Sequence, residues 1–208
     1  MKPTLTESII DALTRIPHGW CSIEKALELA DTITSNKMER IVEIGVFAGR
    51  SLIPMALACK HQGFGKVVGI DPWQPQASVE GQTGENMTWW SKLDHDAIYA
   101  EFLRCVAILG VEPYVDVQRL RSDDFFPIGP IQLLHVDGNH SDQALRDAER
   151  YAPLVPVGGY TYLDDLGWQG GGVTRAMYAI QEMGFEKQYD RDTGAMFKRV
   201  RNNGLIFP

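Results

Sequence analysis

The first residues of this 208-residue chain that suggest chemistry are a glycine-bearing loop and an acidic residue beyond it. The loop is Glu43-Ile44-Gly45-Val46-Phe47-Ala48-Gly49, and Asp71 lies one predicted strand-helix-strand unit further on. Glycines let a backbone turn sharply and approach a ligand closely. An acidic residue at this separation can accept hydrogen bonds from ribose hydroxyls. The pattern therefore predicts a nucleoside-containing cofactor, although Gly49 follows Gly45 by four positions and does not match the G-x-G-x-x-G spacing of dinucleotide sites.

Three further carboxylates are expected at the same edge of the fold. Asp137 follows a predicted strand over residues 131–136, and Asp164 and Asp165 follow another over residues 159–163. Three carboxylates held together would repel one another, and a hard divalent cation such as Mg²⁺ would remove that repulsion. Such an ion could also lower the pKa of a substrate hydroxyl. The alternative is a site without an ion, in which Asp164 and Asp165 shape the pocket mouth and Asp137 orients His140 or binds the cofactor amine.

The elements that must position these residues follow from hydrophobic periodicity. Strands are predicted over residues 40–44, 66–70, 114–118, 131–136 and 159–163, and helices over residues 51–60, 95–109, 141–155 and 173–183. Strands that alternate with helices form a mostly parallel sheet. Two last strands, 185–189 and 195–200, are joined by a link too short for a parallel crossover, so the sheet should end in an antiparallel hairpin.

Two segments lie outside this alternation. Residues 1–38 are predicted to form an N-terminal helical cap of two amphipathic helices, the second capped by Ser22. Residues 73–93 fit no regular period, and an irregular segment of this length predicts a lid-like insertion. Its tryptophans, Trp73, Trp89 and Trp90, could cover an adenosine or a sulfonium, whose positive charge favours an aromatic face. Alternatively, they pack the segment onto the rest of the domain.

Composition limits the class of protein. Apolar residues make up 44% and charged residues 23% of the chain, which fits one globular domain over residues 1–208. The net charge of −7 argues against a nucleic-acid partner, because phosphate binding needs clustered Lys and Arg. No window approaches the roughly 20 apolar residues of a spanning helix, and the three cysteines form no disulfide or zinc pattern. We therefore expect a cytoplasmic protein with reduced thiols and no membrane partner.

Four sequence blocks, in this order, resemble the class I S-adenosylmethionine-dependent methyltransferases of family 24. They are residues 41–51, Gly69-Ile70-Asp71-Pro72-Trp73, Val136-Asp137-Gly138-Asn139-His140-Ser141, and Gly158-Gly159 with Leu163-Asp164-Asp165. The resemblance covers roughly residues 20–184 and extends to macrocin-type and catechol-type O-methyltransferases. It implies an α/β, Rossmann-like fold with a mostly parallel seven-stranded sheet that ends in an antiparallel hairpin, helices on both faces, and S-adenosylmethionine as the cofactor.

The resemblance also implies roles for individual residues. The residues expected to bind the cofactor are Glu43, Gly45, Phe47, Gly49, Ser51, Asp71, Trp73, Ser122, Asp123 and Asp137. Ser122 would lie near the adenine ring and Asp123 or Asp124 near its amino group, unless this segment is only a solvated loop with a helix cap. The residues expected to hold Mg²⁺ are Asp137, Asp164 and Asp165.

One departure from the family pattern concerns the general base. Sugar-modifying relatives tend to carry Asp-Gly-Asp after the fourth strand, with the second Asp as the base, whereas this chain has Asn139 there. An amide cannot accept the proton, so His140 is the expected substitute because its ordinary pKa lies near 6.5. His140 and Asp137 are the two residues expected to be catalytic. The alternative is a histidine that caps the next helix or bonds to a neighbouring carboxylate.

The expected function is methyl transfer to a small-molecule or sugar hydroxyl, with or without Mg²⁺. Asn139 keeps open a non-catalytic or regulatory protein that binds S-adenosylmethionine. An NAD-dependent oxidoreductase is disfavoured, because the chain has neither G-x-G-x-x-G nor a Tyr-x-x-x-Lys pair. The expected partner is a small-molecule acceptor, and the assembly is left open between a monomer and a homodimer.

Overall fold

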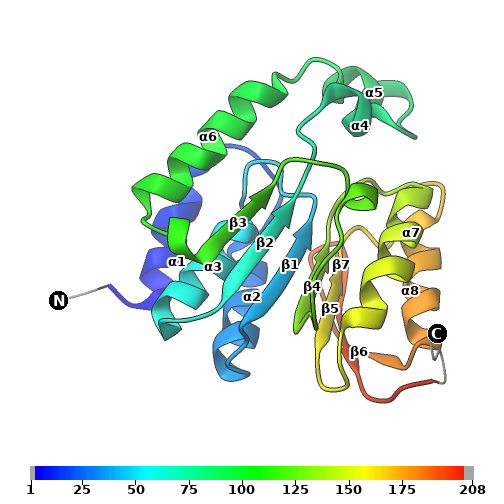
Figure 1. The fold of residues 1–208 in the computed structure, drawn as a ribbon. Coiled ribbons are helices and arrows are strands. Elements are labelled where there is room, and N and C mark those ends of the chain that lie inside the picture. Colours follow the sequence, from blue (N-terminus) through cyan, green and yellow to red (C-terminus); the bar gives the residue numbers. More distant parts are fainter. Residues whose placement is uncertain (1–2, 204–208) are drawn as a thin grey trace.

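The sheet is the framework of the molecule, and residues 3–203 are described in this computed structural model (Figure 1). Its strands are β1 (Arg40–Ile44), β2 (Lys66–Ile70), β3 (Val115–Gln118), β4 (Leu133–Val136), β5 (Tyr160–Leu163), β6 (Phe185–Arg191) and β7 (Gly194–Arg199). Within the described residues these seven strands form one sheet in the order β3-β2-β1-β4-β5-β7-β6. β1 to β5 are parallel, and β7 is antiparallel to both β5 and β6. The predicted fold class, with its closing hairpin, is confirmed.

Four helices cover one face of the sheet (Figure 1). They are α1 (Leu5–Arg15), α2 (Ile23–Ser35), α3 (Leu52–Gln62) and α6 (His95–Ile108). Their apolar side chains, among them Ile9, Leu29, Ile53 and Phe102, share one buried core with Val67 of the sheet. The hydroxyl of Ser22 accepts a hydrogen bond from the backbone N–H of Lys25, so the predicted cap of α2 is present.

Two helices, α7 (Asp142–Tyr151) and α8 (Gly172–Glu182), cover the opposite face. Ala148, Tyr151 and Ile180 pack there against Leu134 and Phe197 of the sheet. The helix predicted over residues 141–155 is shorter than expected, because a 3₁₀ turn over Ala152–Leu154 replaces its end. A proline inside that turn cannot donate the hydrogen bond that would continue an α-helix.

The predicted lid-like segment contains two short helices, α4 (Pro75–Val79) and α5 (Gly84–Trp90), where the sequence showed no period. They project beyond the carboxyl ends of the strands (Figure 1). Neither helix has a buried residue of its own, so contacts with the loops below must hold the segment. Over residues 3–203, none of the helices has both the length and the apolar character needed to cross a membrane.

Candidate active site

A cavity of about 680 Å³ opens at the carboxyl ends of the strands, beneath α4 and α5. Small-molecule sites have volumes of this order and favour the point where strand order reverses, which here lies between β1 and β4. Seven of the ten predicted cofactor residues line the cavity: Gly45, Phe47, Ser51, Asp71, Trp73, Ser122 and Asp137. The other three, Glu43, Gly49 and Asp123, are not part of the lining.

The loop after β1 is held in place by Asp71. One carboxylate oxygen of Asp71 accepts hydrogen bonds from the backbone N–H groups of Val46, at 3.0 Å, and Phe47, at 2.9 Å. The other accepts from the N–H of Trp73 at 2.7 Å. Burial raises the pKa of Asp71, and these three hydrogen bonds oppose that rise. The predicted ribose acceptor therefore also fixes the backbone of the cofactor loop.

Backbone strain is concentrated around the cavity. Phe47, Trp73 and Asp165 all line it and adopt left-handed backbone angles, with φ of 51°, 44° and 53°. Non-glycine residues adopt this region at a cost, and such residues cluster at functional sites. Gly45 has φ of 87°, and a Cβ atom there would lie 2.2 Å from the carbonyl oxygen of Asp137. Glycine is therefore required at position 45 for both conformation and space.

The tryptophans of the lid have different roles. Trp73 is 2% exposed, donates from its indole Nε1 to the carbonyl oxygen of Phe47 at 2.8 Å, and stacks on Phe102. It packs the lid onto the domain, which is one of the two alternatives left open by the sequence. Trp89 and Trp90 instead form an aromatic cluster with Trp20 and Phe47, with ring centroids 4.9–6.5 Å apart. Trp20 is 68% exposed, so this cluster forms an accessible aromatic wall of the cavity.

Asn139 connects the lid to the loop after β4. Its side-chain Nδ2 donates to the backbone carbonyls of Ala77 and Glu80, and its Oδ1 accepts from the N–H of Ser141 at 2.9 Å. An aspartate could not donate to these carbonyls. Asn139 therefore makes a contact with the lid that the aspartate of the family pattern could not make.

The segment after β3 belongs to a buried polar network. The hydroxyl of Ser122 donates to Asp147 at 2.6 Å, and the side-chain amide of Gln143 donates to Asp147 at 2.9 Å and to Asp123 at 3.2 Å. Asp147 is 1% exposed, and its burial raises its pKa to about 6. Of the residues predicted to contact adenine, Ser122 lines the cavity, whereas Asp123 and Asp124 do not, and Asp123 accepts a hydrogen bond from Gln143.

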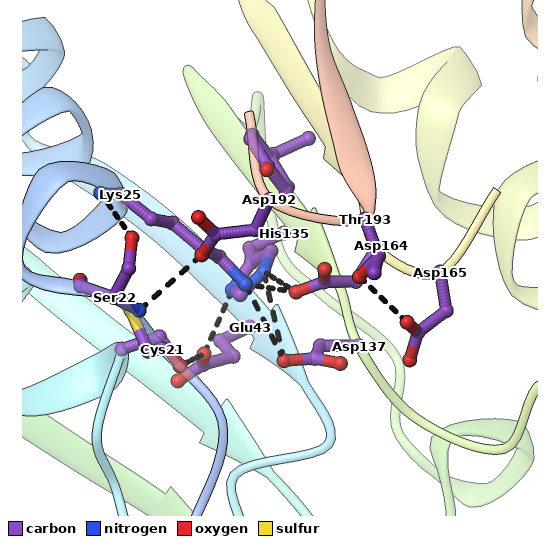
Figure 2. Close-up of polar contacts among 12 residues, drawn as sticks. Cys21, Ser22, Lys25, Glu43, His135, Asp137, Asp164, Asp165, Asp192 and Thr193 are labelled. Carbon is purple, nitrogen blue, oxygen red and sulfur yellow. Dashed lines mark hydrogen bonds and ion pairs between the residues drawn. The ribbon is translucent and has the colours of Figure 1, made fainter. Parts of the chain in front are cut away.

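The three predicted acidic residues, Asp137, Asp164 and Asp165, also line the cavity. The register of the strands brings two of them together. Val136 pairs with Leu163 in the parallel β4–β5 ladder, so Asp137 and Asp164 leave the sheet side by side. Asp164 does not face Asp165: its carboxylate forms an ion pair with Lys25 of α2 and lies 3.4 Å from Nε2 of His135 (Figure 2). Lys25 Nζ is also 3.7 Å from Asp137 Oδ2.

A chain of buried charged groups continues below these carboxylates. His135 Nδ1 lies 2.8 Å from Glu43 Oε1, which also accepts from the hydroxyl of Ser51. Burial and Lys25 act to lower the pKa of His135, but hydrogen bonds to Asp164 and Glu43 raise it to about 9. Glu43, which was predicted to bind the cofactor, is completely buried. Its contacts are with His135 and Ser51.

Asp165 turns the other way and pairs with His140. The two side chains are 2.9 Å apart. Asp165 also accepts a hydrogen bond from the hydroxyl of Thr193 at 2.7 Å (Figure 2). The hydrogen bond from His140 lowers the pKa of Asp165. Both residues line the cavity beside Trp168, whose ring centroid is 4.8 Å from that of His140. The predicted base is therefore oriented by a carboxylate that was predicted as a metal ligand.

Among the unpredicted residues of the site, Lys25 and His135 are the two basic ones that contact the predicted carboxylates. Lys25 lies four positions before Leu29 on the apolar side of α2, and both are buried. That helical spacing was the available signal for an inward-facing lysine. His135 stands inside the apolar run of β4, where a polar residue needs a buried partner.

The chain is similar to a known protein family and to solved structures. The model of the family 24 methyltransferase domain matches residues 42–166, more than half of the 208 residues. A search of curated proteins found no match.

Three solved structures illustrate the structural likeness. The O-methyltransferase TomG from Streptomyces achromogenes, involved in tomaymycin synthesis and solved with S-adenosylmethionine, is 16% identical, with a TM-score of 0.64 over 93% of this chain and 89% of that one. An O-methyltransferase from Bacillus cereus, solved with S-adenosylhomocysteine, is 14% identical, with a TM-score of 0.62 over 97% and 92%. A Podospora anserina methyltransferase, also bound to S-adenosylhomocysteine, is 14% identical, with a TM-score of 0.66 over 97% and 89%. At these identities the likeness shows the fold.

Proposed function

The chain belongs to family 24 of the class I S-adenosylmethionine-dependent methyltransferases, and from this membership we propose that it methylates a hydroxyl oxygen of a small-molecule or sugar acceptor. The family assignment decides against the oxidoreductase alternative. Two of the structurally similar proteins are O-methyltransferases, which supports oxygen as the acceptor atom.

The observation that carries the proposal is the His140–Asp165 pair in the wall of the same cavity as the Gly45 loop. A hydrogen bond from His140 Nε2 to Asp165 leaves Nδ1 of the neutral imidazole as a proton acceptor. A histidine oriented by a carboxylate is a suitable general base near neutral pH. The cofactor methionine and ribose would occupy the part of the cavity bounded by Gly45 and Asp71.

The reaction in this arrangement is a direct displacement. The acceptor oxygen attacks the methyl carbon, the bond from carbon to sulfonium breaks as the bond to oxygen forms, and His140 takes the hydroxyl proton. The products are S-adenosylhomocysteine and the methyl ether. Such a transfer depends mainly on positioning, which the strained, rigidly bonded loops supply. Mg²⁺ assistance stays a prediction, and no step of this transfer is routed through a metal.

The test combines binding with turnover. Calorimetry should detect S-adenosylmethionine and S-adenosylhomocysteine but not NAD, and a panel of phenols and sugars should include one that causes release of S-adenosylhomocysteine. His140→Gln should then lower kcat by about 10²–10⁴-fold with little change in cofactor affinity. His61→Gln, on the exposed end of α3, is the matched control and should leave both unchanged.

Two outcomes would contradict the proposal. Tight cofactor binding without turnover on any acceptor would favour the non-catalytic, regulatory alternative. Full turnover by His140→Gln would remove His140 from the mechanism.

A further inference from the structure

The predicted metal ligands do not converge on one point. Among the described residues, donor atoms that could share a metal form two groups, His135 with Asp137 and Asp164, and Asp137 with His140 and Asp165. No such group within residues 3–203 joins all three predicted aspartates. The carboxylates of Asp164 and Asp165 point in different directions, the first toward Lys25 and the second toward Thr193 (Figure 2).

The inner group already contains a cation. The side chain of Lys25 has no solvent exposure, and its ammonium pairs with Oδ2 of Asp164 and lies 3.7 Å from Oδ2 of Asp137. These are the oxygens through which the two aspartates would bind a metal ion together with His135. A divalent ion held there would lie within a few ångströms of a buried ammonium, and like charges at that distance in a poorly solvated site repel strongly.

Two basic groups already face the acidic groups of this region. Lys25 and His135 lie against the carboxyl groups of Glu43, Asp137 and Asp164. The ring of Tyr162 lies 5.0 Å from Lys25 Nζ and adds a favourable aromatic contact to the ammonium. The two carboxyl groups in contact with Lys25 Nζ favour the charged form of the lysine and offset the cost of its burial.

The lysine comes from the N-terminal cap, outside the part of the chain that matches the family model. α2 presents Lys25 in its first turn, where the hydroxyl of Ser22 caps its backbone N–H at 3.0 Å. The backbone N–H of Ser22 donates to Asp192 in the β6–β7 turn at 3.2 Å (Figure 2). The contacts of Ser22 with Lys25 and with Asp192 thus hold the first turn of α2 in place, and the side chain of Lys25 reaches the residues that follow β4 and β5.

We propose that Lys25 is the resident cation between Asp137 and Asp164, in the place that a divalent metal would otherwise occupy. Its role is to position and neutralise these two side chains. The proposal concerns metal binding at this inner group and does not rest on the proposed function.

The experiment uses Mn²⁺ alone as the probe and follows its free signal by electron paramagnetic resonance. Wild type should show no binding with a dissociation constant below about 1 mM, the weak end of the range for protein carboxylate sites. Lys25→Met removes the ammonium and keeps its length, and should bind Mn²⁺ at least about tenfold more tightly. The Lys25→Met/Asp164→Asn double variant should lose this gain, and Lys66→Met, at an exposed position, should behave as wild type.

Binding by wild type below about 1 mM that is abolished by Asp164→Asn would overturn the proposal. If Lys25→Met does not fold, the wild-type titration alone decides. Failure to find an acceptor would count against the proposed function and leave the Mn²⁺ result standing.

Discussion

Gly45→Ala tests the geometry of the cofactor loop, and Gly63→Ala provides its control. Both glycines have positive φ, 87° and 84°, so alanine at either site meets the same backbone penalty. That penalty is about 1–2 kcal/mol. A Cβ atom on Gly63, which ends α3, would have no neighbour within 4 Å. The two substitutions therefore differ mainly in what the added methyl group meets.

At position 45 the methyl group would meet backbone atoms. The new Cβ atom would lie 2.2 Å from the carbonyl oxygen of Asp137, 2.5 Å from its carbonyl carbon and 2.6 Å from Cα of Gly138. No rotamer relieves these contacts, so the loop after β1 or the loop after β4 must move. Overpacking of this kind costs about 1–3 kcal/mol. We expect Gly45→Ala to lose about 2–5 kcal/mol and Gly63→Ala about 1–2 kcal/mol of unfolding free energy.

Urea unfolding measures the two stabilities, and calorimetry measures binding of S-adenosylhomocysteine. The displaced loop should lower the affinity of Gly45→Ala by at least about tenfold, which corresponds to 1.4 kcal/mol. Gly63→Ala should bind as wild type. Equal losses of stability in the two variants, with unchanged cofactor affinity in both, would refute the close approach of the loops after β1 and β4.

Three further predictions concern single side chains. Because the folded pKa of His135 is raised to about 9 from an ordinary value near 6.5, its stabilisation is complete below about pH 6.5 and is lost as the pH rises to about 9. The free energy of unfolding should fall across that window by on the order of 2–4 kcal/mol. A free energy that does not change with pH, or one that falls as steeply in His135→Gln, would be inconsistent with a raised pKa of His135. Trp73→Phe should lower the free energy of unfolding by about 1–3 kcal/mol, because it leaves a carbonyl unpaired and a gap in the core. Trp89→Phe, on the accessible wall, should lower it by less than about 0.5 kcal/mol. Equal losses in the two variants would contradict the different environments of the two rings. Asn139→Asp should release the lid, seen as faster amide exchange over residues 75–90, and unchanged exchange would show that other contacts hold it.

The arrangement of elements was largely determined by local sequence. The alternation of apolar strands with amphipathic helices is a local property. The link between the last two predicted strands has only five residues, which is too short for a parallel crossover, so the hairpin could be predicted without tertiary information. Gly45 and Asp71 could be assigned to the site because both lie at strand ends, and strand ends of a parallel sheet meet at one edge. The lid was less accessible, because α4 and α5 are too short to show a period.

The partners of the charged residues were decided by tertiary structure. Asp137, Asp164 and Asp165 are close in any fold of this type, but sequence could not show that Asp165 has φ of 53° and turns toward His140. Neither could it show that α2 brings Lys25 to Asp164 across 139 positions of the chain. Periodicity tells which face of an element is buried, whereas the pairing of buried charges depends on how elements distant in sequence pack. For this protein the sequence determined where the site lies, and the packing of α2 against the sheet decided which cation its carboxylates face.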